Sequence, residues 1–307
     1  MRDVTDLSIV ITTYNRARVV ERLLGSLEAQ SDRDFQVVVA IDGSTDGTAQ
    51  MLAGLRPEFD LAWVDTECTG YGLAVARNMG ILRAEGRAVV VLDDDSFPDP
   101  GFVAAHKAAV APGVITAGPR FPADPEGDPR LAWKARELMR LPPLMPLTIP
   151  EMRRDWPTAY LLENNICLLR EDWIAAGLFS ERLKLYGFIG QEFFARAEFL
   201  GLTYQLCPQA AIRHHGELAG DNGLHNSGKK RQTRRAELLR PTLMTPRHFE
   251  AQIAWARARA DGTPPPPLPS WQWQARLALP WRALRRVLGQ GRRWVRKKRV
   301  KRSAPSA

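Results

Sequence analysis

Short apolar runs alternate with amphipathic segments over the first hundred residues. Four runs rich in β-branched residues are typical of buried strands, and they span residues 8–13, 35–41, 61–64 and 88–92. After the first run, apolar residues at helical spacing predict a helix from a cap at Asn15 to about Ala29. Strands that alternate with helices predict a parallel α/β sheet with right-handed crossovers.

Two further helices follow from local signals. The second strand ends in a turn over residues 42–48, in which Asp46 can cap a helix that carries Met51, Leu52 and Leu55. Residues 70–80 open a third helix, which leads back to the fourth strand.

The fourth apolar run ends at three consecutive carboxylates, Asp93, Asp94 and Asp95. The proline-rich stretch 97–100 forbids continuation of the strand, because proline removes a donor and restricts the residue before it. The acids then lie at the carboxyl end of a core strand, where open α/β sheets place ligand crevices. Asp93 and Asp95 share one face, and two such carboxylates suit Mg²⁺ or Mn²⁺. The alternative is a solvated acidic turn.

The pattern is less regular beyond residue 118. Residues 118–158 are rich in proline, interrupted by one amphipathic helix at about 131–140, and such long connections often shape a substrate site. A strand is predicted at 166–169, followed by a helix that begins near Glu171 and ends at Gly177. Another strand at 204–207 precedes the pair His214 and His215.

Composition narrows the class of protein. The 307 residues, 45% hydrophobic and 25% charged, are ordinary for a globular protein of one or two domains. Three widely spaced cysteines without metal-ligand spacing favour a reduced, cytosolic setting. The first residues lack a signal-peptide pattern and no apolar stretch is long enough to span a bilayer, so we expect a cytoplasmic protein.

The net charge of +9 belongs to the end of the chain. Residues 271–307 hold 12 Lys and Arg and no acid, which leaves 31 basic against 34 acidic residues in 1–270. The body is therefore not expected to bind nucleic acid specifically. After a proline spacer, Trp and Leu recur at helical spacing opposite Arg, which predicts an interfacial helix on anionic lipid. The alternatives are a helix packed on the body or a partner, nucleic-acid binding, and disorder.

Four motifs stand in order along the chain, at residues 8–16, 42–48, 76–80 and 92–100. Together they resemble family 2 glycosyltransferases with the GT-A fold, over roughly residues 5–245. The resemblance implies an α/β fold with a mostly parallel central sheet flanked by helices. It implies a glycosyltransferase domain over 1–245, with a nucleotide-binding half at 1–118 and an acceptor half at 119–245. A helix and proline-rich linker at 246–270 and the basic amphipathic helical tail at 271–307 would follow.

The resemblance also assigns roles in the nucleotide-binding half. Tyr14 and Asp42 match positions that hold the nucleotide base, and Arg77 matches one near the phosphates. Asp93 and Asp95 match the Asp-x-Asp motif, which faces the ribose and coordinates metal. The complete expected nucleotide-sugar set is Thr13, Tyr14, Arg16, Asp42, Arg77, Asp93 and Asp94. The expected ligands of Mg²⁺ or Mn²⁺ are Asp95, Asp93 and His214, with His215 as the alternative histidine.

The stretch 163–183 resembles the family segment that leads to the acceptor site. Asn164 and Asn165 are the expected acceptor-binding residues, with a plain turn role as the alternative.

The catalytic base is the least regular part of the match. The family commonly carries a Glu-Asp pair that here falls on Ile189 and Gly190. An inverting transferase needs a carboxylate to take the proton of the acceptor hydroxyl, and Glu192 is the only acid in residues 187–197. Glu192 is therefore the expected base. Its rivals are a helix-cap role for Glu192 and a base elsewhere, such as Glu163.

The residues and the resemblance to family 2 together imply an inverting, metal-dependent glycosyltransferase. It would move a sugar from a nucleoside-diphosphate sugar to a hydroxyl of a glycan, lipid-linked or other acceptor. It would work in the cytoplasm, with peripheral contact to the inner face of the cell membrane through the tail. The alternatives are a sugar-phosphate nucleotidyltransferase and a non-catalytic protein that binds nucleotide-sugars.

Overall fold

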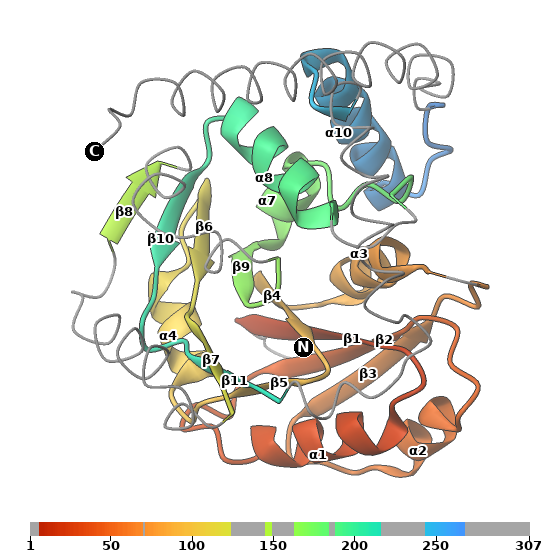
Figure 1. Ribbon diagram of the computed structural model, residues 1–307, viewed down its shortest axis with the longest axis vertical. Helices are drawn as coiled ribbons and strands as arrows, with labels where there is room; N and C mark the ends of the chain where they lie inside the picture. Colours follow the sequence, from red (N-terminus) through yellow and green to blue (C-terminus); the bar gives the residue numbers. More distant parts are fainter. Residues whose placement is uncertain are drawn as a thin grey trace, which may run out of the picture.

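The computed structural model describes residues 6–69, 71–123, 145–148, 163–183, 188–215 and 243–267. Its main sheet has eight strands in the order β3-β2-β1-β4-β9-β6-β10-β8 (Figure 1). The bounds are β1 (Leu7–Thr13), β2 (Gln36–Ile41), β3 (Asp60–Asp65), β4 (Ala88–Asp93), β6 (Val114–Ala117), β8 (Met145–Thr148), β9 (Ile166–Leu169) and β10 (Thr203–Leu206). β3, β2, β1 and β4 are mutually parallel, whereas β9 is antiparallel to both of its neighbours and β8 is antiparallel to β10.

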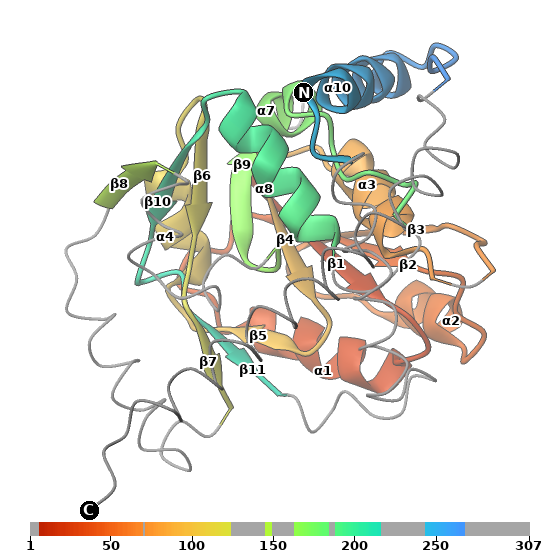
Figure 2. The same cartoon turned by 45° about the horizontal axis from the view of Figure 1, so that its top comes forward.

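The four predicted N-terminal strands are confirmed, and their burial explains why the sequence shows them so clearly. Every residue of β1 and β2 is buried, because helices cover both faces of the sheet. One face packs on α1 (Ala17–Leu27), α2 (Thr48–Gly54) and α4 (Phe102–Ala109). The other packs on α3 (Leu73–Arg83), α7 (Arg170–Ala175), α8 (Ile189–Phe199) and α10 (Pro246–Ala260), as Figures 1 and 2 show.

A second, three-stranded sheet lies beside the first. Its order is β5-β11-β7, from β5 (Ser96–Pro98), β11 (Ile212–His214) and β7 (Arg120–Pro122). The fourth strand ends at the three acids as expected, since β4 stops at Asp93, and the separate short strand β5 that follows pairs antiparallel with β11 in the second sheet. Pro98 is compatible with this pairing because β5 is an edge strand, in which a missing donor is tolerated.

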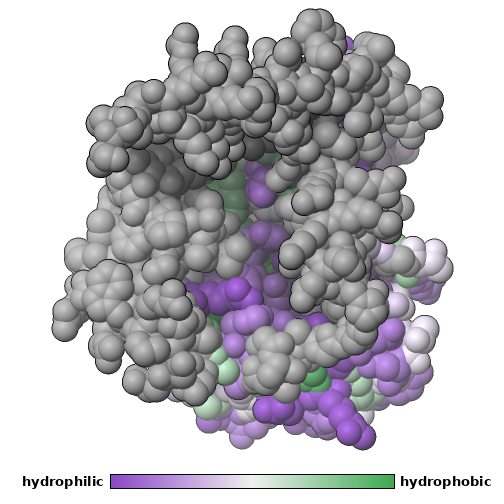
Figure 3. Space-filling model, viewed as in Figure 1, coloured by the Kyte–Doolittle hydropathy of each residue, from purple (hydrophilic) through white to green (hydrophobic). Residues whose placement is uncertain are grey.

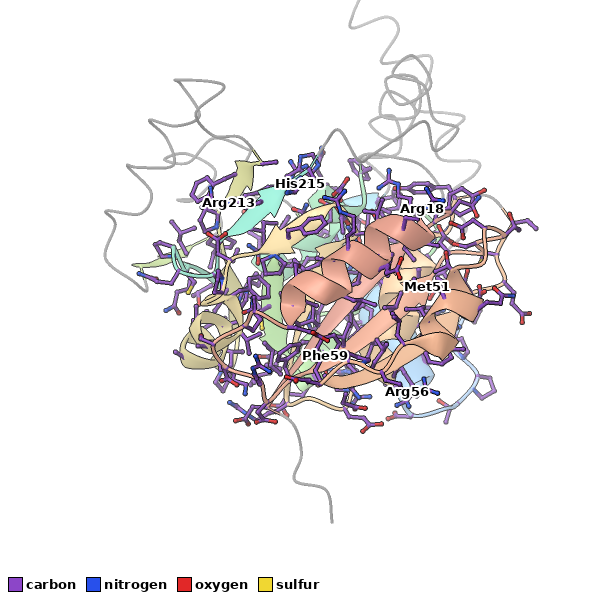
Figure 4. The ribbon with its side chains drawn as sticks, turned by 90° about the horizontal axis from the view of Figure 1, so that it is seen from below. Arg18, Met51, Arg56, Phe59, Arg213 and His215 are labelled. Carbon is purple, nitrogen blue, oxygen red and sulfur yellow. The ribbon has the colours of Figure 1, made fainter. Side chains whose placement is uncertain are left out.

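The loops after β1 and β2 are fastened to each other. Asp46 accepts hydrogen bonds from the backbone N–H of Thr48 at 3.2 Å and of Ala17 at 2.8 Å, so it serves the first turns of both α2 and α1. Asn15, expected to cap α1, instead has φ 51° and accepts a bond from the Thr45 N–H at 2.7 Å. Figure 4, which shows the molecule from below, shows Met51 of α2 lying toward α1.

Helix α10 belongs to the packed body. Trp255 and Ala256 join the same apolar cluster as α7 and α8, and Gln252 donates to the Gly177 carbonyl at 3.0 Å. Gly177 itself has φ 89° and ends α7, as predicted. Within the described residues, no helix has the length and apolarity needed to cross a membrane. The expectations for residues 131–140 and for the tail 271–307 fall outside the described part of the chain.

Candidate functional site

The predicted donor-side residues meet at one edge of the main sheet. Thr13 ends β1, Asp42 follows β2 and Asp93 ends β4, and the parallel register of these strands brings the three ends together. This is the carboxyl edge of a parallel sheet, where α/β proteins bind ligands. In the space-filling view, the described residues at the hollowed centre of the face are largely hydrophilic (Figure 3).

Asp42 sits in a tight backbone setting. Its Oδ2 accepts a hydrogen bond from the Gly72 N–H at 3.0 Å, and a Cβ added to Gly72 would lie 2.2 Å from Oδ1. Burial raises the pKa of Asp42, against the opposing hydrogen bonds from Gly72 and the Thr66 hydroxyl. Tyr14 stands near this end of the site with 40% of its surface exposed, so its ring is accessible.

Asp94 lies behind the site. It is buried, its Oδ2 accepts from the Thr13 hydroxyl at 2.8 Å, and its Oδ1 accepts from Arg16 Nη1 at 2.6 Å. Burial raises the pKa of this carboxyl to about 6, although Arg16 and Thr13 oppose the shift. Asp94 and Thr13 were expected to touch a ligand directly, but in the structure the Thr13 hydroxyl binds Asp94, and Asp94 binds Arg16, which also approaches Asp95 Oδ2 at 3.6 Å.

Asp95 is paired with His214. The His214 Nε2 lies 3.5 Å from Asp95 Oδ2, and the pairing of β5 with β11 sets His214 opposite Ser96, the residue after Asp95. Burial alone would raise the pKa of Asp95. The hydrogen bond and charge of His214, helped by Arg16 and Arg120, outweigh burial and hold that pKa below its ordinary value.

Asp93 is positioned by two donors. Arg77 Nη2 donates to its Oδ1 at 2.8 Å, and Asn164 Nδ2 donates to its Oδ2 at 3.2 Å. Its side chain keeps 36% of its surface exposed. Arg77 is itself buried, with its guanidinium 5.2 Å from the centre of the Phe179 ring. The structure therefore places Arg77 behind Asp93 rather than at the surface where a diphosphate would bind.

The residues present fit a divalent cation that shares its coordination with a ligand. Asp95 and His214 together offer oxygen and nitrogen donors, and Mg²⁺ is commonly held by one or two carboxylates plus substrate phosphates. The three expected ligands do not form a closed cage, because the described residues contain no group of three or more His, Cys, Asp or Glu side chains arranged for a metal. Asp93 stands apart, with one oxygen bound to Arg77 and the other to Asn164.

The two predicted acceptor residues have different roles. Asn165 is completely buried, in a left-handed conformation with φ 62°, and it contacts His106 Nε2 at 3.0 Å and the Ala210 carbonyl at 2.8 Å. The expectation that Asn165 binds acceptor was therefore wrong, because its amide is used inside the core. Asn164 Oδ1 is buried but, unlike the Asn165 amide, has no hydrogen-bond partner among the described residues, so an acceptor role for Asn164 stays a prediction.

Glu192 is not placed as a base. Its side chain is 0% exposed and accepts hydrogen bonds from Arg196 Nε at 3.0 Å and Nη2 at 2.9 Å, with His248 Nε2 at 3.4 Å. Burial opposes ionisation, but the charge and hydrogen bonds of Arg196 and His248 lower the pKa of Glu192 below its usual range. A base must reach the proton it abstracts, so this expectation was wrong. The i,i+4 spacing of Glu192 and Arg196 was the available signal.

Comparisons with known proteins identify a family for this chain. Glycosyl transferase family 2 matches residues 8–168. Validoxylamine A glucosyltransferase of Streptomyces hygroscopicus subsp. jinggangensis (strain 5008) is 31% identical over 205 residues, covering 59% of this chain and 48% of that protein. The chain thus spans about half the length of this curated relative.

Solved structures show the same fold. S. aureus TarS 1-349 in complex with UDP-GlcNAc superposes with a TM-score of 0.54 at 18% identity, over 83% of this chain and 73% of that one. The mannosyltransferase PcManGT from Pyrobaculum calidifontis, in complex with GDP-Man and Mn²⁺, gives 0.50 at 23% identity, over 89% and 72%. The fold is Rossmann-like and of the GT-A type, with a mostly parallel sheet. Since the family match extends over more than half of the sequence, the chain belongs to glycosyl transferase family 2.

Proposed function

We propose that this chain transfers a sugar, with inversion, from a nucleoside-diphosphate sugar to a hydroxyl acceptor. The observation that carries the proposal is the meeting of Asp42, Asp93 and Asp95 at the carboxyl edge of β1, β2 and β4, with His214 brought beside Asp95 by the second sheet. A base, a ribose and a diphosphate need contacts spread along such an edge.

Each part of the donor has a matching contact. The exposed Tyr14 ring would stack on the nucleotide base, and Asp42 would accept a base N–H. Asp93, held in place by Arg77 and Asn164, would face the ribose. The solved relatives with UDP-GlcNAc and with GDP-Man support a nucleotide-sugar donor of this general kind.

Asp95 and His214 are the residues that would hold Mg²⁺ or Mn²⁺. A bound divalent cation supplies positive charge to the departing diphosphate. The Mn²⁺ in the PcManGT complex supports this part of the proposal. Arg16, between Asp94 and Asp95, would keep the Asp95 carboxylate in position before the donor arrives.

On the acceptor side, the chemistry proposed is a hydroxyl of a glycan or of a lipid-linked acceptor. Asn164 Oδ1, unpartnered among the described residues, would accept a hydrogen bond from a sugar hydroxyl near Asp93. The basic tail 271–307 would bring the enzyme to an anionic membrane surface.

The test is a donor screen followed by a product assay. UDP-glucose, UDP-GlcNAc and GDP-mannose are added with Mn²⁺, Mg²⁺ or EDTA, and metal-dependent thermal stabilisation identifies the donor. Release of nucleoside diphosphate is then measured for the wild type, for Asp95→Ala and for the exposed control Asp34→Ala. We expect release in the wild type and the control, and loss in Asp95→Ala with the fold intact.

Other products would point to other functions. Pyrophosphate release would indicate nucleotidyl transfer. Binding of a nucleotide-sugar without transfer or hydrolysis would indicate a non-catalytic protein. Asp95→Ala activity near that of the wild type would refute the metal role of Asp95.

A further inference from the structure

Gly190, the second residue of α8, has no room for a side chain. A Cβ built on it would lie 2.2 Å from Oε2 of Glu163, 2.8 Å from Cδ and 3.1 Å from Cβ of the same residue. All three nearest atoms belong to Glu163, so the Glu163 side chain occupies the space into which a residue at 190 would project. Figure 2 shows β9, which Glu163 precedes, alongside α8.

Position 190 is where the family motif would put its second acid, by the count back from Arg196 and Gly201. This chain has a glycine there and a carboxylate that reaches the same space from another segment. The carboxylate of Glu163 therefore lies where an acidic side chain at position 190 would lie, although residue 190 itself is a glycine.

Glu163 also faces the donor residues. Its Oε1 lies 3.6 Å from Nη1 of Arg77, the guanidinium that grips Asp93 through Nη2. The next residue, Asn164, donates to the other oxygen of Asp93. The Glu163 side chain keeps 26% of its surface exposed, so an incoming hydroxyl can reach it.

Three other carboxylates near the site already bind neighbouring side chains. Glu192 is buried on Arg196, Asp94 is buried on Thr13 and Arg16, and Asp95 pairs with His214. By contrast, the described residues donate no hydrogen bond to Glu163 within normal distance. Its ion pair with Arg77, at 3.6 Å, is longer than the 2.8 Å ion pair between Arg77 and Asp93. A general base must be a carboxylate that the acceptor hydroxyl can reach and that does not already accept hydrogen bonds from neighbouring donors.

We propose that Glu163 is the general base of the transfer reaction, and that Gly190 is a glycine so that Glu163 can reach its place. The inference rests on the proposed function. An oxygen of Glu163 takes the proton of the acceptor hydroxyl while that hydroxyl oxygen forms a bond to the anomeric carbon. The bond from the anomeric carbon to the diphosphate oxygen breaks, and its electron pair leaves on the diphosphate. Glu163 then returns the proton to solvent.

The first experiment compares Glu163→Gln with wild type. UDP release from the donor that binds, UDP-glucose or UDP-GlcNAc, is followed with Mn²⁺ and with water or an added glycan as acceptor. We expect kcat to fall by about 100-fold or more, which is the usual contribution of a positioned base. UDP affinity should stay within about twofold, because the carboxylate acts on the acceptor. Glu171→Gln, in the exposed first turn of α7, is the matched control and should keep wild-type kcat.

The second experiment removes the carboxylate at residue 163 and places one on α8, at residue 190. Glu163→Gly removes the side chain that fills the space, and Gly190→Asp then supplies a carboxylate to that space from the other segment. The double variant should recover at least about tenfold in kcat over Glu163→Gly alone. Gly190→Asp alone should be impaired, since it collides with Glu163.

Three results would overturn the assignment. One is a Glu163→Gln enzyme with kcat within about tenfold of wild type, and another is a swapped variant no more active than Glu163→Gly. A loss of kcat matched by an equal loss of UDP affinity would assign Glu163 to donor positioning instead. If wild type releases no nucleoside diphosphate from any donor of the screen, the proposed function fails, and that outcome is separate because wild type and all variants then behave alike.

Discussion

The carboxylate of Glu192 accepts two hydrogen bonds from the guanidinium of Arg196, at 3.0 and 2.9 Å, with both side chains completely buried. Arg196 also donates to the Leu178 carbonyl at 2.7 Å and to the Ala176 carbonyl. The pair thus ties α8 to the segment after α7, and its role is in stability.

Replacement of Glu192 by Gln should therefore destabilise the protein without changing its chemistry. The substitution leaves the buried charge of Arg196 uncompensated, which typically costs about 3–5 kcal/mol. Urea unfolding measures the free energy of unfolding, and Glu171→Gln should change it by less than about 0.5 kcal/mol. If Glu192→Gln keeps wild-type stability and loses transfer, Glu192 is the base after all.

The end of the site that would bind the nucleotide base should be sensitive to one methyl group added at residue 72. In Gly72→Ala the new Cβ would press on Asp42 Oδ1, which is only 2.2 Å away, and would displace the carboxylate. We expect UDP affinity, measured by calorimetry, to fall about tenfold or more while the protein stays folded. Gly25→Ala on α1 is the control, since nothing lies within 4 Å of its added Cβ. Equal affinity in the two variants would show that Asp42 does not contact the base.

The two adjacent histidines should differ in their effect on metal. His214 faces Asp95, whereas the His215 ring packs 4.6 Å from the Phe97 ring, and Figure 4 shows His215 at this edge. His214→Ala should raise the Mn²⁺ concentration needed for half-maximal activity by at least about tenfold, in line with the usual effect of altered metal coordination. His215→Ala should leave it nearly unchanged. The reverse order would make His215 the ligand.

Stability should fall on acidification because of His106. Complete burial lowers the pKa of His106 to about 4, although its contact with Asn165 works in the opposite direction. Below the ordinary histidine pKa of 6.5 the unfolded chain binds a proton that the folded chain refuses, so stability is lost as pH falls from about 6.5 toward 4. One proton gives a slope of about 1.4 kcal/mol per pH unit. Chemical unfolding at several pH values should show this slope in wild type and a shallower one in His106→Gln; parallel curves would rule out His106 as the cause.

The tail is expected to direct membrane contact by charge. Residues 271–307 carry 12 basic residues and no acidic one, so the full chain should sediment with vesicles that contain anionic lipid and not with neutral vesicles. Deletion of 271–307 should abolish the sedimentation, and added salt should weaken it. Equal binding to both vesicle types would reject electrostatic docking.

The donor side could be predicted from sequence because its signals are local. The runs that became β1, β2 and β4 each contain consecutive apolar residues, and parallel strands necessarily present their following residues at one edge. The sheet of β5, β11 and β7 could not be predicted, since each strand has three residues and the pairings join segments far apart in the sequence, such as Ile212 with Pro98 and Ile212 with Arg120. The same holds for Asn165, whose partner His106 lies 59 residues earlier.

The base was misassigned for a related reason. A shift of two residues kept an acid near the family position, but the side-chain direction on α8 depends on Arg196 and His248, which hold Glu192 in the interior. The acid that reaches position 190 comes from a different segment, and only the packing of Glu163 against Gly190 reveals it.

The contacts of Asp46 and Asn15 have a thermodynamic consequence for ligand capture. One carboxylate serves the starts of two helices, and Asn15 joins the same two loops through Thr45 and through a bond from its N–H to Ser44 at 2.9 Å. The segments that carry Tyr14 and Asp42 are thus held together by hydrogen bonds before any nucleotide binds. A nucleotide base that binds there does not have to order these loops, so little binding free energy is spent on ordering them. This pre-organisation favours tight binding of the donor.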